Sequence, residues 1–169
     1  MKKIVSFVAI VLLSSSFVTT IAHAEQSMAV NIKRLSMESA LKIAQAAIAA
    51  CRKEGVQVAV TVVDRGGNAQ VVLRDVLAMD LTLSISQQKA YTAMSFNAAT
   101  SSLEGRFKTH GSIAKIAGIV FSAGGVPIQA GGTIYGGVGV SGAPSGETDE
   151  KCAKAGVAAV ADDLEMATM

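Results

Sequence analysis

A glycine-centred turn between two β-branched runs restricts the fold of this chain more than any other feature. The turn is Asp64-Arg-Gly-Gly-Asn68, and residues 56–64 and 69–74 on either side are rich in valine. Glycine supplies the backbone conformations that a tight turn needs, so this pattern predicts a β-hairpin. A second glycine turn, at 130–133, lies within 116–142, where we expect three further short strands.

Helical periodicity marks the segments between and around these strands. Residues 37–51 place apolar side chains on one helix face after a good N-cap, Ser36. A second helix is expected over 79–96, apolar on more than one side, and a capping box at Ser101 and Glu104 predicts a short third one. The last helix is expected from about 145 to 164. Because hairpins dominate, the sequence predicts an α+β fold with a mainly antiparallel five-stranded sheet.

The string Gly137-Val-Gly-Val-Ser-Gly142 has the spacing of a dinucleotide-binding loop. That loop requires a second parallel strand and an acidic residue about 20 residues further on, and the residues after Gly142 hold one helix and a tail. The dinucleotide interpretation therefore fails. Two alternatives remain open: the glycines allow close backbone packing, or residues 141–146 lead into a helix N-terminus that contacts an anion.

Residues 1–24 have the three parts of a cleaved signal peptide: a basic start, an apolar run of ten residues and the small-residue site Ala22-His-Ala24. We therefore expect a mature protein of residues 25–169 that is periplasmic or secreted. Cleavage removes two of the 15 basic residues and leaves 13 against 13 acidic ones, so the mature charge is zero. A nucleic-acid binder normally carries a basic excess, and that class is excluded.

Two cysteines, Cys51 and Cys152, remain in the mature chain. An oxidising compartment would allow them to form a disulfide. Two separate buried thiols are the alternative, because pairing requires close Cα atoms that a sequence does not reveal.

Four segments, "VTVVDRGGNAQVVLRD", "KAYTA", "AGGVPI" and "GGTIYGGVGVSGAPSGETDEKCAKAG", occur in an order and spacing that resemble the GlcG/HbpS-like haem-binding family, which also includes the C-terminal domain of PduO-type proteins. The resemblance covers about residues 36–160. It implies a single-domain α/β/α layered sandwich that forms homo-oligomers, from dimers to octamers. It also implies haem or another tetrapyrrole as ligand and, for secreted members, a membrane sensor as partner. The residues that match the family pattern are Asp64, Gly66, Gly67, Arg74, Lys89, Thr92, Gly125, Pro127, Gly139, Ser141, Gly142 and Asp149.

A haem site needs an apolar slot, cations for the propionates and usually an axial ligand. Arg74 and Lys89 are the candidate cations, and the alternative for each is a solvated charge or a structural ion pair. His110, the single histidine of the mature chain, is the candidate metal ligand, or else an exposed loop residue. Ser141 and Gly142 enter through the resemblance. The fallback iron ligands are Tyr91, Met94 and Tyr135.

One departure from the family pattern concerns the segment after the second predicted strand. Relatives often have Arg-Met-Asp there, whereas this chain has Arg74-Asp75 followed later by Met79-Asp80. The loop before the long helix is therefore expected to differ in shape.

The residues show no catalytic constellation, since one histidine supports neither a hydrolase triad nor a zinc site. The sequence thus predicts an exported, oligomeric haem-binding protein that scavenges or senses its ligand. Two alternatives stay open. One is a small haem- or flavin-assisted oxidoreductase, and the other is a structural module that binds nothing small.

Overall fold

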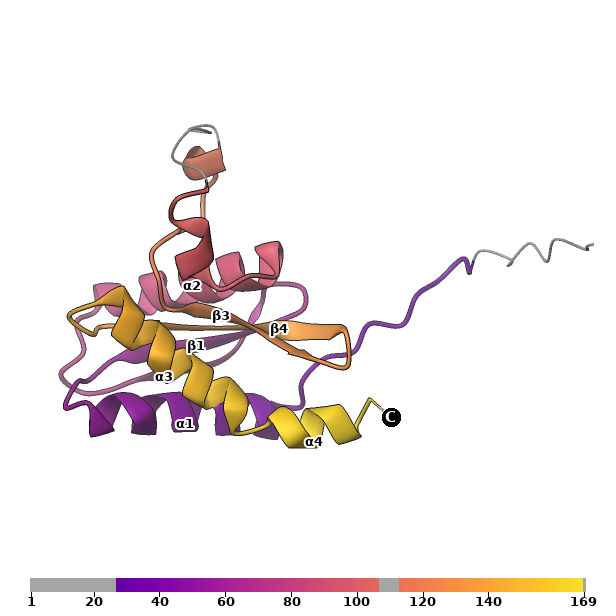
Figure 1. Ribbon diagram of the computed structural model, residues 1–169, viewed down its shortest axis with the longest axis horizontal. Coiled ribbons are helices and arrows are strands. Elements are labelled where there is room, and N and C mark those ends of the chain that lie inside the picture. The colour runs from indigo at the N-terminus through magenta and orange to yellow at the C-terminus, as the bar shows by residue number, and fades with distance from the viewer. Residues whose placement is uncertain (1–26, 107–112, 169) are drawn as a thin grey trace, which may run out of the picture. The chain divides into compact units, whose positions relative to one another are not determined.

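The computed structural model describes residues 27–106 and 113–168. The predicted signal peptide and His110 lie outside these ranges. Contacts divide the chain into two units, residues 1–30 and 31–169. Residues 27–30 of the first unit are exposed. The second unit contains all the helices and strands described below (Figure 1).

The sheet of the second unit has four strands in the order β2-β1-β4-β3, and every neighbouring pair is antiparallel. The strands are β1 (Ala59–Asp64), β2 (Ala69–Arg74), β3 (Gly125–Ala130) and β4 (Thr133–Ser141). Asp64–Asn68 forms the predicted turn, in which Asp64 accepts hydrogen bonds from the backbone N–H of Gly66 at 2.8 Å and of Asn68 at 3.0 Å. The predicted α+β class and both hairpins are confirmed.

The predicted five-stranded sheet is wrong for the described residues, because the first of the three strands expected in 116–142 does not form. Its backbone is held by side chains instead. Val120 N–H donates to Thr92 Oγ1 at 3.0 Å, and Ala123 N–H donates to Glu104 Oε1 at 2.7 Å. Side-chain acceptors thus take the place of a strand partner.

Helices cover both faces of the sheet (Figure 1). On one face lie α1 (Met37–Lys53) and α3 (Gly146–Ala158), which pack against each other, and on the other lies α2 (Leu81–Phe96). The main apolar core fills the α1–α3 side; it includes Ile43, Val60, Val62, Val138 and Val140. The α2 side holds a smaller apolar cluster of Val63, Ala90 and Met94.

Short helices complete the unit: η1 (Thr100–Leu103), η2 (Ile113–Lys115) and α4 (Ala161–Met166). The expected helix over 145–164 is divided into α3 and α4. The capping box predicted at Ser101 and Glu104 is wrong. Ala99 is the N-cap of η1, and Ser101 instead donates two hydrogen bonds to Glu150, from its N–H at 3.1 Å and its Oγ at 2.9 Å.

The glycines of β4 allow α2 to lie directly on the sheet. A Cβ atom at Gly139 would be 2.0 Å from the Ser86 carbonyl oxygen, and one at Gly137 would be 2.4 Å from that of Ala90. A side chain at either position would separate helix and strand. The close-packing interpretation is therefore the one that the structure supports. The described topology contains no parallel strand pair of the kind that a dinucleotide loop needs.

Cys51 of α1 and Cys152 of α3 form a disulfide, with Cα atoms 5.5 Å apart. Of the two alternatives that the sequence left open, the structure therefore shows the disulfide and not two separate thiols. It joins the two helices that cover the same face of the sheet, across a sequence separation of 101.

Candidate functional site

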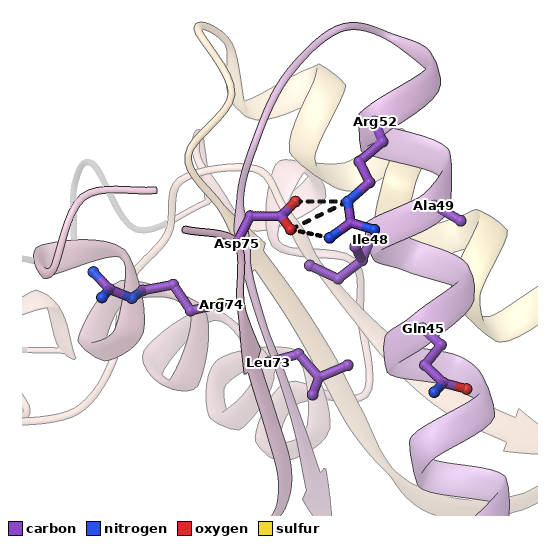
Figure 2. Close-up of a pocket in the computed structure, with 7 residues that line it drawn as sticks. All are labelled: Gln45, Ile48, Ala49, Arg52, Leu73, Arg74 and Asp75. Atoms are coloured by element: carbon purple, nitrogen blue, oxygen red, sulfur yellow. Dashed lines mark hydrogen bonds and ion pairs between the residues drawn. The ribbon is translucent and has the colours of Figure 1, made fainter. Parts of the chain in front are cut away.

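A cavity of about 420 Å³ opens between α1 and the end of β2 (Figure 2). Gln45, Ile48, Ala49 and Arg52 line it from the helix. They are spaced i, i+3, i+4 and i+7, which puts them on one face of α1. The other wall consists of Leu73, Arg74 and Asp75. The cavity therefore combines an apolar surface with a charged end.

The charged end of this cavity is an ion pair between Arg52 and Asp75. Arg52 Nε donates to the two carboxylate oxygens at 3.1 and 3.2 Å, and Nη2 also contacts Oδ1. Asp75 is buried and held in place by its N–H, which donates to the Val58 carbonyl at 3.0 Å. Its hydrogen bonds and negative charge raise the pKa of Arg52, so the guanidinium stays charged. Among the described residues, Nη1 of Arg52 has no acceptor, which leaves two donors for an anion.

Arg74, a predicted propionate cation, lies beside this cavity, but its side chain points away from it (Figure 2). Strand alternation explains the direction, because Leu73 and Asp75 face α1 and Arg74 faces the opposite side of the sheet. Its Nη1 donates to the Ala78 carbonyl at 2.9 Å and contacts the Asp80 carboxylate. The loop in which the sequence departs from its family pattern is thus fastened by this arginine.

Lys89, the second predicted cation, lies in a buried ion pair. Its Nζ is 2.8 Å from Asp149 Oδ2, and both side chains are 4% exposed. Burial raises the pKa of Asp149, although the hydrogen bonds from Lys89 and from the N–H of Ala143 act in the opposite direction. The structural ion pair that the sequence left open for Lys89 is therefore what the structure shows.

Ser141 and Gly142 lie at the end of β4, next to this ion pair. Ser141 is buried, and Ala59 pairs with it on one side and with Arg74 on the other. Gly142 has a φ of +135°, and a backbone hydrogen bond there helps to hold Asp149. The structure thus brings Lys89, Ser141 and Gly142 together at one end of the sheet, in packed surroundings, and none of them lines the α1–β2 cavity.

The fallback iron ligands have different surroundings. Tyr135 is 4% exposed, and its buried hydroxyl has no hydrogen-bond partner among residues 27–106 and 113–168. Met94 is also buried, with Sδ 3.3 Å from Nη1 of Arg65. Tyr91 is 37% exposed and lines a second, smaller cavity of about 290 Å³ with Gly67, Gln87, Gln88, Ala117 and Gly118. Of these three, Tyr91 alone is accessible from a cavity.

The α1–β2 cavity fits part of what haem requires. Ile48, Ala49 and Leu73 offer an apolar wall, and Arg52 offers donors for a carboxylate. Its lining contains no histidine, cysteine, methionine or tyrosine, the usual protein ligands of haem iron. An iron ligand must therefore come from elsewhere, and His110 lies outside the described residues. The described residues also contain no cluster of three or more histidine, cysteine, aspartate or glutamate side chains that could hold a bare metal ion.

Apart from Arg74, the residues that line this cavity were not predicted as site residues from the sequence. The spacing of Gln45, Ile48, Ala49 and Arg52 on one helix face was visible, and an arginine at the end of an apolar face was a usable signal. Asp75 was named only as part of a family departure. No spacing rule connects Arg52 with Asp75, which is 23 residues further along the chain.

No helix between residues 27 and 106 or 113 and 168 is both long and apolar enough to span a bilayer.

The chain resembles several solved structures. A double mutant of HbpS from Streptomyces reticuli is 42% identical, with a TM-score of 0.75 over 80% of this chain and 92% of that one. Protein ORFY of Klebsiella pneumoniae is 25% identical, with a TM-score of 0.76 over 80% and 97%. A complex of PduOC with haem is 27% identical, with a TM-score of 0.69 over 75% and 94%. The model of the family described as "Haem degrading protein HbpS-like" matches residues 35–158, and the chain belongs to that family.

Proposed function

We propose that this chain is an exported, oligomeric haem-binding protein that scavenges or senses haem. The observation that carries the proposal is membership of the HbpS-like family over residues 35–158. Haem is the cofactor that this membership supports, and the PduOC structure with haem, at 27% identity, adds to it. Bound haem would supply iron for redox chemistry, which the side chains of the described residues do not provide.

The α1–β2 cavity is the place we propose for the ligand. Its volume of about 420 Å³ lies within the range of small-molecule sites, roughly 300–1,000 Å³. Ile48 and Leu73 would contact the apolar part of the porphyrin, and Nη1 of Arg52 would bind a propionate. Arg52 takes the role that the sequence gave to Arg74, because the Arg74 side chain points away from the cavity.

His110 remains the predicted iron ligand for haem in this cavity. Tyr91 belongs to α2, on the opposite face of the sheet, and is the alternative only if haem occupies the second cavity, which Tyr91 lines. Imidazole and phenolate are both established ligands of haem iron. In the His110→Ala variant the haem spectrum should change from that of a histidine complex, whereas Tyr91→Phe should leave it unaltered. The reverse result would assign the iron to Tyr91.

Two features support export and assembly. The Cys51–Cys152 disulfide is typical of an oxidising compartment, in agreement with the predicted cleavage after Ala24. The loop before α2 and the first turn of that helix expose several large apolar side chains, with Val76 84% and Leu77 77% exposed, a pattern typical of a subunit contact. Mass spectrometry of the exported protein should give a chain that begins at Glu25. Light scattering should show an oligomer that Leu77→Asp dissociates.

The experiment that tests ligand binding is a titration of the mature protein with haemin, followed in the visible spectrum. We expect a Soret shift that saturates at a fixed stoichiometry. Ala49→Trp should fill the cavity and weaken binding at least about tenfold, because it removes the contact surface for the porphyrin.

Glu38→Trp is the matched control, because it adds the same ring to an exposed position of α1 about 16 Å along the helix. Equal affinities for Ala49→Trp and the wild-type protein would move the ligand away from this cavity. Absence of any Soret shift, together with a homogeneous oligomer, would replace the proposal by the structural alternative.

A second candidate function is haem degradation, favoured by the description of the matching family. It is tested by incubating the haem complex with ascorbate under air. Loss of the Soret band that depends on protein and stops when the reductant is omitted would support an enzyme. A stable spectrum would support a scavenger or sensor.

A further inference from the structure

A separate cleft of about 480 Å³ lies where the segment before α1 meets two hairpin turns. Asn31, Ile32 and Lys33 line it from the N-terminal side, Arg65 from the β1–β2 turn, and Gly132, Thr133 and Ile134 from the β3–β4 hairpin. None of these residues lines the α1–β2 cavity. The cleft is therefore independent of the site proposed for haem.

The segment that forms one wall of this cleft is fastened to the sheet. Leu35 is 5% exposed in the main core, and its carbonyl accepts a hydrogen bond from Gln70 Nε2 at 3.1 Å. Arg34 Nη1 lies 3.6 Å from Asp64 Oδ2 in the β1–β2 turn. These contacts hold Lys33 on the same side of the fold as Arg65.

The cleft carries two cations without an acidic partner among the described residues. Seven other basic side chains of the described residues form ion pairs elsewhere in the fold, whereas Lys33 and Arg65 form none. Asp64 is adjacent to Arg65 in the chain, but both of its oxygens are in use. Oδ1 accepts the turn hydrogen bonds, and Oδ2 faces Arg34.

The remaining contact of Arg65 supports an open binding position. Its Nη1 donates to Met94 Sδ at 3.3 Å, and a thioether is a weak acceptor that does not neutralise a guanidinium. This contact orients the side chain and leaves its charge available. A planar guanidinium with free donors is well suited to a carboxylate.

The rest of the lining is mixed, with Asn31 and Thr133 polar and the two isoleucines apolar. Ile32 is 64% exposed, and Ile134 is partly exposed on the hairpin. Gly132 has a φ of +74°, and no atom lies within 4 Å of the position that its Cβ would occupy. The space beside the Gly132 backbone is therefore open.

From these contacts we infer that the cleft binds an amphiphilic organic carboxylate. The charged group of the ligand is held by Lys33 and Arg65, and its apolar body lies against Ile32 and Ile134. A charged ligand without an apolar part gains only the screened attraction of two exposed cations, and an uncharged one gains only the apolar contact. The cleft favours a molecule that has both.

Octanoate is the probe for this site, and isothermal titration calorimetry of the mature protein is the measurement. We expect saturable binding of one octanoate per chain. At the same concentrations 1-octanol, which lacks the charge, and inorganic phosphate, which lacks the tail, should not bind. The double variant Lys33→Gln/Arg65→Gln should weaken octanoate binding at least about tenfold, since hydrogen bonds to charged groups are lost.

The matched control is Lys53→Gln/Lys115→Gln, which removes two exposed cations that lie outside the cleft. A second variant, Thr133→Trp, blocks the cleft and keeps its charges, and it should also abolish binding. The inference is overturned if octanoate does not saturate, if phosphate binds equally well, or if the control pair weakens binding as much. Weaker haemin binding by Lys33→Gln/Arg65→Gln would overturn it too, by assigning the cleft to haem.

Discussion

Lys89 and Asp149 form an ion pair that connects the two helical layers at the end of the sheet. Nζ of Lys89 on α2 lies 2.8 Å from Oδ2 of Asp149 on α3, with both side chains 4% exposed. Gly124 makes room for it, since a Cβ atom there would be 2.6 Å from the lysine nitrogen. The two layers therefore contact each other through charge as well as through the sheet.

Breaking this pair should destabilise the protein strongly. Lys89→Met leaves the Asp149 carboxylate buried without a cation, and we expect the free energy of unfolding to fall by about 3–5 kcal/mol. Lys42→Met is the control, because Lys42 pairs with Asp163 at 2.9 Å on the surface and its loss should cost less than about 1 kcal/mol. Urea unfolding measures both. If both variants lost the same free energy of unfolding, the buried ion pair would contribute no more to stability than the surface pair.

The contact between α2 and β4 should not tolerate even one added methyl group. In Gly139→Ala the new Cβ would meet the Ser86 carbonyl oxygen at 2.0 Å, and backbone must move to relieve it. We expect a loss of at least about 2 kcal/mol in the free energy of unfolding. Gly105→Ala adds the same group where no atom lies within 4 Å, and its stability should stay within about 0.5 kcal/mol of wild type. A stable Gly139→Ala protein would contradict the observed packing.

The disulfide should contribute substantially to stability because it closes a long loop. Its sequence separation is 101, and cross-linking a loop of this length contributes up to about 4.7 kcal/mol through the unfolded state. Cys51→Ala/Cys152→Ala should lower the free energy of unfolding by about 2–5 kcal/mol. Dithiothreitol should destabilise the wild-type protein and leave the double variant unchanged. If the reductant had no effect on the wild-type protein, these cysteines would not be paired in solution.

Asp64 should make stability depend on pH in acid. Burial alone would raise the pKa of this carboxyl, but hydrogen bonds from the N–H groups of Asn68 and Gly66 and the charge of Arg34 outweigh it and lower the pKa below 3.8. A lowered pKa means that the stabilisation is present above the unfolded-state value and disappears as pH falls through the folded-state value.

Asp64→Asn tests this dependence, because asparagine keeps an oxygen for the turn hydrogen bonds and removes the charge. The variant should be less stable than wild type at pH 7, and the difference should shrink as the pH falls below about 4. Chemical unfolding across this range measures it. Asp162→Asn, at an exposed position of α4, should show no such trend. A difference that is constant with pH would exclude a role for the Asp64 charge.

Local signals predicted most of the fold. Ser36 begins α1 as expected, with its Oγ accepting from the Ser39 N–H at 3.1 Å, and the Asp64–Asn68 turn joins β1 to β2. Both features depend on residues a few positions apart in the chain, so they can be recognised in a single sequence. The glycine pattern of β4 also indicated close packing, although the partner helix was not identified.

The errors arose where distant residues decide the outcome. Residues 116–121 contain strand-forming side chains, but Thr92 and Glu104 bind backbone groups of this region, and no strand forms. Glu104 was expected to cap a helix next to it in sequence, and it instead reaches Ala123. Such competition between local and distant acceptors is invisible to a local pattern.

The candidate site was predictable only in part. Lys89 was singled out as an unusual cation. Its partner, Asp149, is 60 residues away in the chain, so the sequence did not reveal that the lysine forms a buried internal ion pair and does not face a ligand. Arg74 was predicted as a cation for a propionate, at the end of the second strand, but strand alternation directs its side chain away from the α1–β2 cavity (Figure 2). The roles of charged residues were thus decided by which side of a strand or helix they occupy.

The apolar cores on the two sides of the sheet differ in size, which implies that one helical layer unfolds locally before the other. The α1–α3 side has a large apolar core and a covalent link. By contrast, α2 is held by close backbone packing, one ion pair, hydrogen bonds of Ser86 and Thr92, and the small cluster around Met94. Amide protons of α2 should therefore exchange with solvent before those of α1. The α1–α3 layer would then stay folded while α2 opens locally.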